Sequence, residues 1–173
     1  MAGMQQQSAW IGLGANLGDA RRCLAEALRC IDAVPGVRVA AVSSLYRTEP
    51  IDAEGPDFTN AVARVETELS PLGLLSALQE IELRLGRVRP VGIHNAPRTI
   101  DLDIELFGNG PVSDPSRLVV PHPRMHERRF VLEPLLEVSP DARIPGKGAA
   151  ADFLPGVLSQ RLERIGPFDW RNS

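Results

Sequence analysis

Residues 97–104 read Pro-Arg-Thr-Ile-Asp-Leu-Asp-Ile, and the alternating polar and apolar residues at their end predict a β-strand with two carboxylates on one face. Successive side chains of a strand point to opposite faces, so Asp101 and Asp103 share one face. The other face is expected to carry Leu102, Ile104 and Leu106. Carboxylates whose Cα atoms lie about 6 to 7 Å apart repel each other unless a cation lies between them, and carboxylate oxygens are ligands that Mg²⁺ prefers. The pair therefore predicts a divalent metal site, although an isolated Asp-x-Asp is more often the solvated face of a half-buried strand.

The positive charge of the chain is concentrated around this strand. Between Arg84 and Arg129 there are eight arginines and five acidic residues, a local balance of +3, whereas the whole chain has a net charge of −3. All three histidines, His94, His122 and His126, lie in the same segment. Cations gathered around a carboxylate pair in an acidic protein favour a compact polyanion bound with its metal, such as magnesium nucleotide, over a long nucleic-acid backbone. A solvated arginine-rich face is the alternative.

Length and composition are typical of a single globular domain: 173 residues, of which 43% are hydrophobic and 24% charged. We expect a flexible N-terminal tail over residues 1–8, one domain over residues 9–165 and a C-terminal tail over residues 166–173. The sequence has no run of about 18 apolar residues and no basic segment followed by an apolar one, which predicts a cytoplasmic protein without a membrane segment. No heptad stripe indicates assembly, so we expect a monomer.

The predicted elements follow the order strand, helix, strand, strand, helix, strand. The strands are expected over residues 9–14, 37–46 and 58–68 and from Asp101 onward, and the helices over residues 20–34 and 71–85, with Asp19 and Ser70 as N-caps. This βαββαβ order predicts an α+β, ferredoxin-like fold, in which helices cover one face of an antiparallel sheet and the other face is free for a site. Further helices are expected near Met125, over residues 130–138 and over residues 151–162.

The glycine-containing segments exclude the common nucleotide-binding loops. The only lysine, Lys147, lies in Pro-Gly-Lys-Gly-Ala and is not followed by Ser or Thr, so the sequence has no P-loop. Residues 12–18, Gly-Leu-Gly-Ala-Asn-Leu-Gly, lack the GxGxxG spacing, and we expect them to form a tight turn between the first strand and the first helix. A nucleotide site must therefore be of another design.

The strand over residues 58–68 predicts a binding surface. Phe58 and Asn60 share one face, whereas Ala61, Ala63 and Val65 give the opposite face the small apolar character that packs beneath helices. An aromatic ring with a carboxamide two residues later can stack on a flat heterocycle and pair with its edge. An aromatic in a sheet is more often part of the core, which is the alternative here.

Five motifs together resemble the 6-hydroxymethyl-7,8-dihydropterin pyrophosphokinases of the folate pathway. The resemblance runs from about Trp10 to Pro140, and its Arg-Thr-Ile-Asp-Leu-Asp stretch is the most specific part. The motifs are Tyr-Arg-Thr-Glu-Pro at 46–50, Asp-Phe-Thr-Asn-Ala at 57–61, Ile-Glu at 81–82 with Gly-Arg-Val-Arg at 86–89, Ala-Pro-Arg-Thr-Ile-Asp-Leu-Asp-Ile at 96–104, and Val-Pro-His-Pro-Arg-Met at 120–125 with Arg-Arg-Phe at 128–130.

This resemblance implies that the chain transfers the β,γ-diphosphate of ATP to the hydroxymethyl group of the pterin and releases AMP, with two Mg²⁺ ions held by Asp101 and Asp103. It implies that Arg87 and Arg98 are catalytic and grip the polyphosphate. The residues implied to bind ATP are Gln79, Glu82, Arg87, Arg98, Arg117, His122 and Arg128. Those implied to bind the pterin are Thr48, Phe58, Asn60 and Phe130, and Asn16 also matches the family.

The resemblance further implies that the loop over residues 87–97 closes over ATP, although Asn95 stands where many members carry a tryptophan. A non-catalytic ferredoxin-like module that binds a nucleotide, a pterin or RNA is the main alternative, and diphosphate transfer to another alcohol is the second. The acidic charge of the chain argues against RNA, and the Asp pair with Arg98 favours catalysis. The expected partners are ATP and the pterin, without nucleic acid or membrane.

Overall fold

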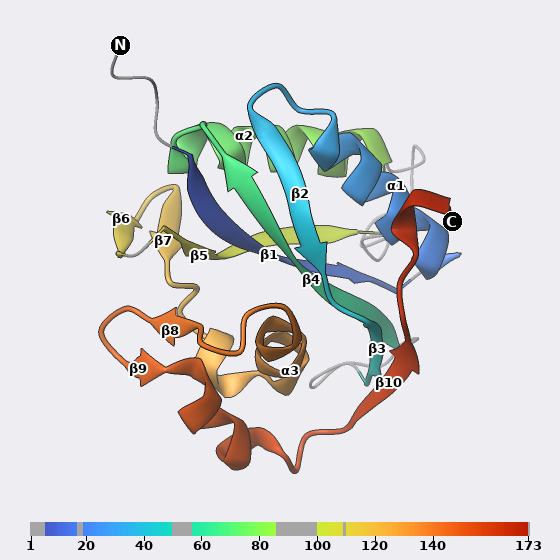
Figure 1. The fold of residues 1–173 in the computed structure, drawn as a ribbon, viewed down its shortest axis with the longest axis vertical. Helices are drawn as coiled ribbons and strands as arrows, with labels where there is room; N and C mark the ends of the chain where they lie inside the picture. Colours follow the sequence, from blue (N-terminus) through green and yellow to red (C-terminus); the bar gives the residue numbers. More distant parts are fainter. Residues whose placement is uncertain (1–5, 17–18, 50–56, 86–99, 109, 173) are drawn as a thin grey trace, which may run out of the picture.

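A six-stranded antiparallel sheet forms the centre of the protein (Figure 1). The structure is a computed structural model that describes residues 6–16, 19–49, 57–85, 100–108 and 110–172. Strand β1 (Gln7–Ala15) lies between β4 (Phe58–Thr67) and β5 (Asp101–Phe107), and β2 (Val37–Val42) and β3 (Leu45–Thr48) pair with successive parts of β4. Strand β10 (Leu162–Gly166) extends the sheet beyond β3. The order from β5 through β1 and β4 to β2 and β3 is the ferredoxin-like arrangement, so the predicted α+β fold is confirmed.

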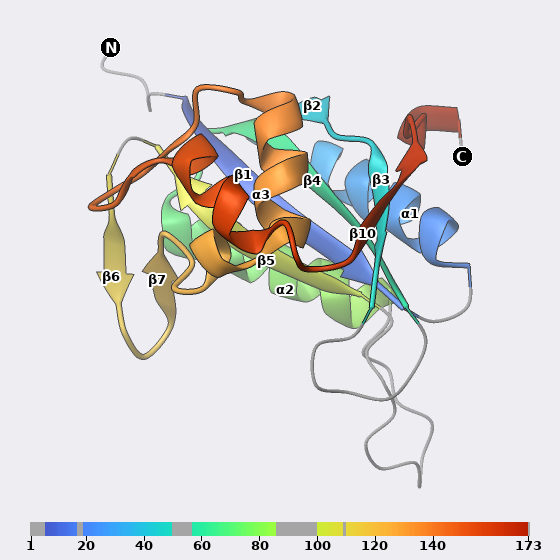
Figure 2. The same ribbon diagram turned by 90° about the horizontal axis from the view of Figure 1, so that it is seen from below.

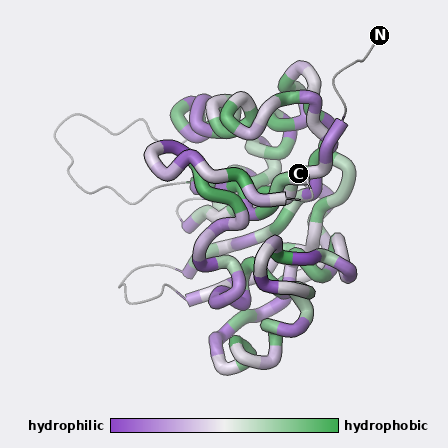
Figure 3. The backbone as a smooth tube through the Cα atoms, turned by 90° about the vertical axis from the view of Figure 1, so that its left-hand side faces the viewer, coloured by the Kyte–Doolittle hydropathy of each residue, from purple (hydrophilic) through white to green (hydrophobic). Residues whose placement is uncertain are grey.

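Helices α1 (Ala20–Asp32) and α2 (Pro71–Leu85) cover one face of this sheet, as predicted. Their N-termini are capped by the expected side chains: Asp19 accepts a hydrogen bond from the backbone N–H of Arg22 (3.1 Å), and Ser70 accepts one from Gly73 (3.0 Å). Between them and the sheet lies the main core, which includes Ile11, Leu13, Leu24, Leu28, Ile31, Ala61, Ala63, Val65, Leu74, Leu78, Leu102 and Ile104. The helices change between green and purple along their length in Figure 3, because each buries only one side.

Helix α3 (Arg129–Val138) packs on the opposite face, so that face is only partly free (Figure 2). A second core forms beneath it from Val62, Leu106, Met125, Val131, Leu132 and Leu135. Most of the remaining elements surround α3 and the end of β5: β6 (Val112–Asp114), β7 (Leu118–Val120), η1 (Met125–Glu127), β8 (Arg143–Ile144), β9 (Gly148–Ala149) and η2 (Ala150–Val157). The last element, η3 (Trp170–Asn172), lies beside α1 instead. The part of the sheet that α3 leaves uncovered is where a site can form.

The single strand expected over residues 37–46 is wrong, because the chain divides it into β2 and β3 at Ser43 and Ser44. The Glu137 carboxylate of α3 accepts hydrogen bonds from the backbone N–H and the hydroxyl of Ser44 (3.0 and 2.7 Å) and from the hydroxyl of Tyr46 (2.6 Å). These bonds replace the sheet partner that the Ser44 N–H would have in a continuous strand. They also tie α3 to β3.

The helix expected over residues 151–162 is also wrong. It is a 3₁₀ helix, η2, that ends at Val157, and Pro155 and Gly156 within it disfavour an α-helix. The residues after Gly166, which we expected to form a tail, include Phe168 and Trp170, and both are buried in the main core. No helix among the described residues is long and apolar enough to cross a membrane.

Candidate active site

The floor of the site is formed by two glycines of the central strand. Gly12 and Gly14 lie within β1, which confirms the strand expected over residues 9–14, so the part of the expected turn that included these two glycines is wrong. Gly14 pairs with Asn60 of β4 on one side and Asp101 of β5 on the other. A Cβ at Gly14 would lie 2.9 Å from Asn60 Nδ2, and one at Gly12 would lie 3.0 Å from Oε1 of Glu105. The absence of side chains at both glycines therefore lets Asn60 and Glu105 of the neighbouring strands lie close over β1.

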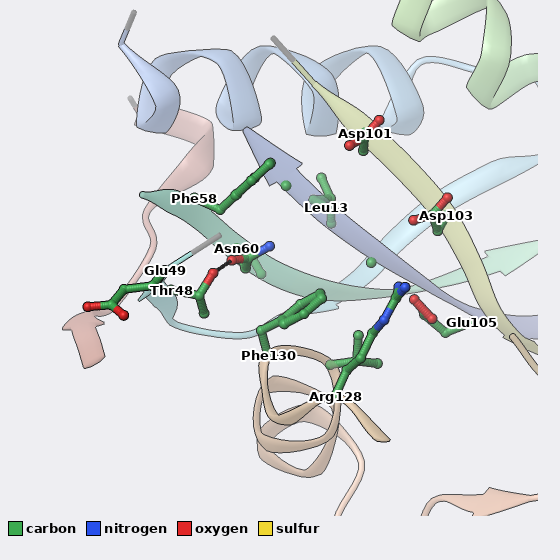
Figure 4. A pocket seen from close by; sticks show the side chains of 14 residues that line it. Leu13, Thr48, Glu49, Phe58, Asn60, Asp101, Asp103, Glu105, Arg128 and Phe130 are labelled. Atoms are coloured by element: carbon green, nitrogen blue, oxygen red, sulfur yellow. Dashed lines mark hydrogen bonds between the residues drawn. The ribbon is translucent and has the colours of Figure 1, made fainter. Parts of the chain in front are cut away.

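One pocket above this floor brings together most of the side chains that the sequence analysis selected (Figure 4). Seven expected residues line it, namely Thr48, Phe58, Asn60, Asp101, Asp103, Arg128 and Phe130. The other lining residues are Gly12, Leu13, Gly14, Glu49, Ala61, Glu105 and Val131. They come from β1, β3, β4 and β5 and from the start of α3, so the pocket occupies the part of the sheet that α3 does not cover.

Aromatic and amide groups form one end of the pocket. In Figure 4, Asn60 lies between Phe58 of β4 and Phe130 of α3. The Thr48 hydroxyl donates a hydrogen bond of 2.7 Å to Oδ1 of Asn60, and each of these two residues is only 6% exposed. With its oxygen bound to Thr48, the amide turns its NH₂ group over Gly14. This end can hold a flat ring between two aromatic faces and donate hydrogen bonds to its edge.

Carboxylates of β5 form the other end. Asp101 and Asp103 line the pocket as the alternation predicts, with Asp101 partly buried and Asp103 exposed. The structure adds Glu105, which the same alternation could have identified. Glu105 is 2% exposed, and burial, with a smaller effect of the Asp103 charge, raises its pKa to about 8 despite the opposing effect of Arg128. Three carboxyl groups of one strand therefore face the pocket.

A bulge in the pairing of β1 and β5 corrects one expectation. The register shifts between Trp10 and Ile11, so that Ile11 pairs with Ile104 and Trp10 with Leu106. Leu106 consequently lies in the second core beneath α3, and its predicted place beside Leu102 is wrong.

Basic groups border the carboxylate end. The guanidinium carbon of Arg128 lies 5.6 Å from the centre of the Phe130 ring. His122 is partly buried, and this burial lowers its pKa, which the charge of Asp103 partly offsets. The backbone N–H of His122 donates to the carbonyl of Glu105 (3.0 Å), which holds the histidine against β5. The positive charge of Arg128 thus lies near the carboxylates of β5, between the aromatic end and the acidic end of the pocket.

Other selected residues do not line the pocket. Glu82 of α2 is buried, and its carboxylate accepts a hydrogen bond of 2.7 Å from the backbone N–H of Leu102, between the two aspartates. Gln79 is exposed on α2, and Arg117 is exposed and forms an ion pair with Asp114 (2.9 Å). Arg87, Arg98 and the loop over residues 87–97 lie outside the described residues. Asn16, at the end of β1, keeps its side-chain oxygen buried without a hydrogen-bond partner among the described residues.

The residues of the pocket fit a magnesium site in which phosphate oxygens of a substrate supply some of the ligands. Within the described residues, no group of three or more histidine, cysteine, aspartate or glutamate side chains could enclose a metal ion. Asp101 and Asp103 nevertheless line one pocket with their carboxylates. Mg²⁺ is commonly bound in this way, by one or two carboxylates together with phosphate oxygens and water.

Comparisons with known proteins agree with this arrangement. Residues 10–140 match the sequence profile of 7,8-dihydro-6-hydroxymethylpterin-pyrophosphokinase. A protein of Methylorubrum extorquens named 2-amino-4-hydroxy-6-hydroxymethyldihydropteridine pyrophosphokinase is 46% identical over 158 residues, which cover 91% of this chain and 98% of that protein. A Pseudomonas aeruginosa protein of the same name is 42% identical over 160 residues, covering 92% and 97%.

A solved structure shares the fold. The crystal structure of a Plasmodium falciparum HPPK-DHPS triple mutant superimposes with a TM-score of 0.70 at 15% identity, covering 91% of this chain but 45% of that one. At that identity the likeness concerns the fold alone, whereas the profile match and the bacterial relatives extend over most of the chain. The chain therefore belongs to the 7,8-dihydro-6-hydroxymethylpterin-pyrophosphokinase family.

Proposed function

We propose that this protein transfers the β,γ-diphosphate of ATP to the hydroxymethyl group of 6-hydroxymethyl-7,8-dihydropterin, giving AMP and the pterin diphosphate for folate biosynthesis. One observation carries the proposal. A single pocket has a ring-binding end, formed by Phe58, Asn60 and Phe130, and an acidic end, formed by Asp101 and Asp103. A substrate that is a flat ring bearing an alcohol would fit between them with the alcohol toward the aspartates.

The ring-binding end accounts for the pterin. Phe58 and Phe130 would hold the ring between their faces, and the NH₂ group of Asn60 would donate to an acceptor on its edge. Thr48 fixes the direction of that amide through its 2.7 Å hydrogen bond. Because both members of this pair are buried, water does not compete with the substrate for their groups.

The acidic end accounts for the phosphates. Asp101 and Asp103 would hold two Mg²⁺ ions, which supply charge neutralisation and alignment of the phosphate oxygens. Arg128 is placed to contact phosphate, because it borders both ends of the pocket. Arg87 and Arg98 are assigned to the polyphosphate, and Gln79, Arg117 and His122 to the nucleotide, on the resemblance alone. Glu82 would act through β5, since it accepts the hydrogen bond of Leu102.

The reaction needs no covalent intermediate. The pterin hydroxyl oxygen forms a bond to the β-phosphorus, the bond from that phosphorus to the oxygen bridging to the α-phosphate breaks, and the hydroxyl proton passes to solvent. Charge develops on phosphate oxygens, so positioning and electrostatic stabilisation carry the catalysis. We further propose that the enzyme acts as a monomer in the cytoplasm.

The test is AMP release from ATP and Mg²⁺, with and without the pterin, in the wild type and in Asp101→Ala and Asp103→Ala. Pterin-dependent AMP formation that collapses in both variants supports the proposal. A 6-methylpterin, which has the ring without the hydroxyl, serves as the control substrate and should give no AMP above background. ADP as the product, or nucleotide binding without turnover in the wild type, would overturn the proposal in favour of another kinase or of a binding module.

A further inference from the structure

Glu105 is a buried acidic group of the pocket to which the proposed reaction gives no task. Its side chain is 2% exposed, and its Oε2 has no hydrogen-bond partner among the described residues. A buried carboxyl oxygen without a partner is costly, and sequences remove such groups unless they serve a purpose. The residue also lines the pocket, and of the lining residues that the structure describes it is the one buried ionisable side chain.

A group of suitable chemistry, Arg128, lines the same pocket. Its charge acts on the Glu105 carboxyl, and the two side chains point toward one another across the pocket in Figure 4. Within the described part of the chain, the guanidinium has a ring contact with Phe130 but no ion pair or hydrogen bond. A donor and an acceptor thus face each other, and each has the capacity for one more hydrogen bond.

The floor of the pocket fixes where the Glu105 carboxyl lies. A Cβ at Gly12 would lie 3.0 Å from its Oε1, so the carboxyl lies close against β1, and a side chain at this position would force it to shift. The alternation along β5 turns Glu105 toward the pocket, as it does Asp101 and Asp103. The bare backbone at Gly12 and this alternation together place the carboxyl on the same pocket as the guanidinium.

We propose that Glu105 is a positioning residue for Arg128: when the nucleotide binds, the guanidinium donates a hydrogen bond to the free Oε2 of the Glu105 carboxyl and is thereby held over Phe130 at the junction of the two ends of the pocket. From this position the remaining N–H groups of Arg128 face the phosphates of the nucleotide. The proposal rests on the proposed function in one respect, since the task of Arg128 is phosphate binding.

Two substitutions of Glu105 separate positioning from packing. Glu105→Met keeps the length of the side chain and removes the acceptor, whereas Glu105→Gln keeps a carbonyl acceptor. We expect the Met variant to bind a non-hydrolysable magnesium ATP analogue about tenfold more weakly, as the loss of one hydrogen bond to a charged group predicts, and the Gln variant to stay within about threefold of wild type. The melting temperature of the Met variant should equal or exceed that of wild type, because an unpaired buried oxygen has been removed.

The matched control is Glu133→Met, which removes a carboxylate that pairs with Arg129 (3.0 Å) on the same helix and does not line the pocket. Nucleotide affinity should not change in it. In an Arg128→Met background, Glu105→Met should weaken binding by less than twofold, because its effect acts through Arg128. Isothermal titration calorimetry gives all these affinities without turnover.

A Glu105→Met protein that binds the analogue as tightly as wild type would overturn the inference, and so would equal losses in the Met and Gln variants. Failure of the proposed function is distinguishable, since it would appear as absence of pterin-dependent AMP formation in the wild type itself.

Discussion

The hydrogen bond between Thr48 and Asn60 offers a direct test of how the pocket selects its ring. Thr48→Val keeps the shape of the side chain and removes the hydroxyl that donates to Oδ1 of Asn60 over 2.7 Å. The amide oxygen is then left buried without its donor, and the amide can rotate to exchange its oxygen and its NH₂ group. Asn60 would no longer present its donors to the pocket in a fixed direction.

The expected size follows from the burial of the pair. Each residue is 6% exposed, so water cannot replace the lost donor, and an unsatisfied buried acceptor costs about 1 to 3 kcal/mol. Rotation of the amide relieves part of this cost in the free enzyme, but the rotated amide binds the pterin less well. We expect this to weaken pterin binding by about 1.4 kcal/mol, which is a factor of about ten in affinity. We expect the KM for the pterin to rise about tenfold, with kcat and the KM for ATP within twofold of wild type, as for a contact made equally in the ground and transition states.

The assay is AMP release at saturating ATP over a range of pterin concentrations. Thr48→Ser, which retains the hydroxyl, is the control and should lie within threefold of wild type. A Thr48→Val enzyme with an unchanged pterin KM would refute the reasoning. So would an equal rise in the KM for ATP, which would indicate a general distortion of β3.

Three further predictions concern the acidic strand and the links that support it. Asp103→Asn should lower turnover at least about 100-fold and raise the Mg²⁺ concentration needed for half-maximal AMP formation, and an unchanged magnesium titration would contradict its role. Glu82→Leu leaves the Leu102 N–H without its acceptor (2.7 Å) and should lower stability by about 1 to 3 kcal/mol, or about 3 to 10 °C in melting temperature, whereas Glu82→Gln should lose less than half as much. Although partial burial acts to raise it, hydrogen bonds from Tyr46 and Ser44 lower the pKa of Glu137 below its ordinary 4.5. Its stabilising effect is therefore complete above that pH and lost as pH falls through the lower native pKa, so urea midpoints of wild type should fall more steeply below about pH 4.5 than those of Glu137→Gln. Parallel curves would show that the carboxylate is not linked to folding.

The sequence predicts correctly those parts of the fold that are determined by residues close to one another in the chain. The N-caps at Asp19 and Ser70 and the helical spacing of apolar residues predict α1 and α2 correctly, because these signals act over one or two turns. The period of two correctly placed Asp101 with Asp103 and Phe58 with Asn60 on the face that carries the pocket. The same alternation extends to Glu105, so its place facing the pocket could also have been predicted from the sequence.

The errors arise from partners that are distant in sequence. β2 ends before Ser44 because Glu137, 93 residues later, takes up its N–H. Leu106 changes face because of a bulge set by its pairing with Trp10, which no property of the residues around Leu106 indicates. Gly12 and Gly14 lie in a strand that was predicted, but residue type does not reveal that their missing side chains leave room for side chains of two other strands. Such features depend on which strands become neighbours, and residue type alone does not specify that.

The position of β10 has a consequence for how the ends of this protein can be altered. β10 pairs with β3, the strand that carries Thr48, and the chain beyond it is anchored by buried Trp170, whose carbonyl accepts a hydrogen bond from Arg29 (3.0 Å). A chain shortened before Leu162 would leave the backbone N–H and C=O groups of β3 unpaired directly beside the pocket, and exposed edges of this kind invite pairing with another molecule. Removal of the last dozen residues would therefore favour aggregation through β3, so purification tags and fusion partners should be attached to the intact C-terminus.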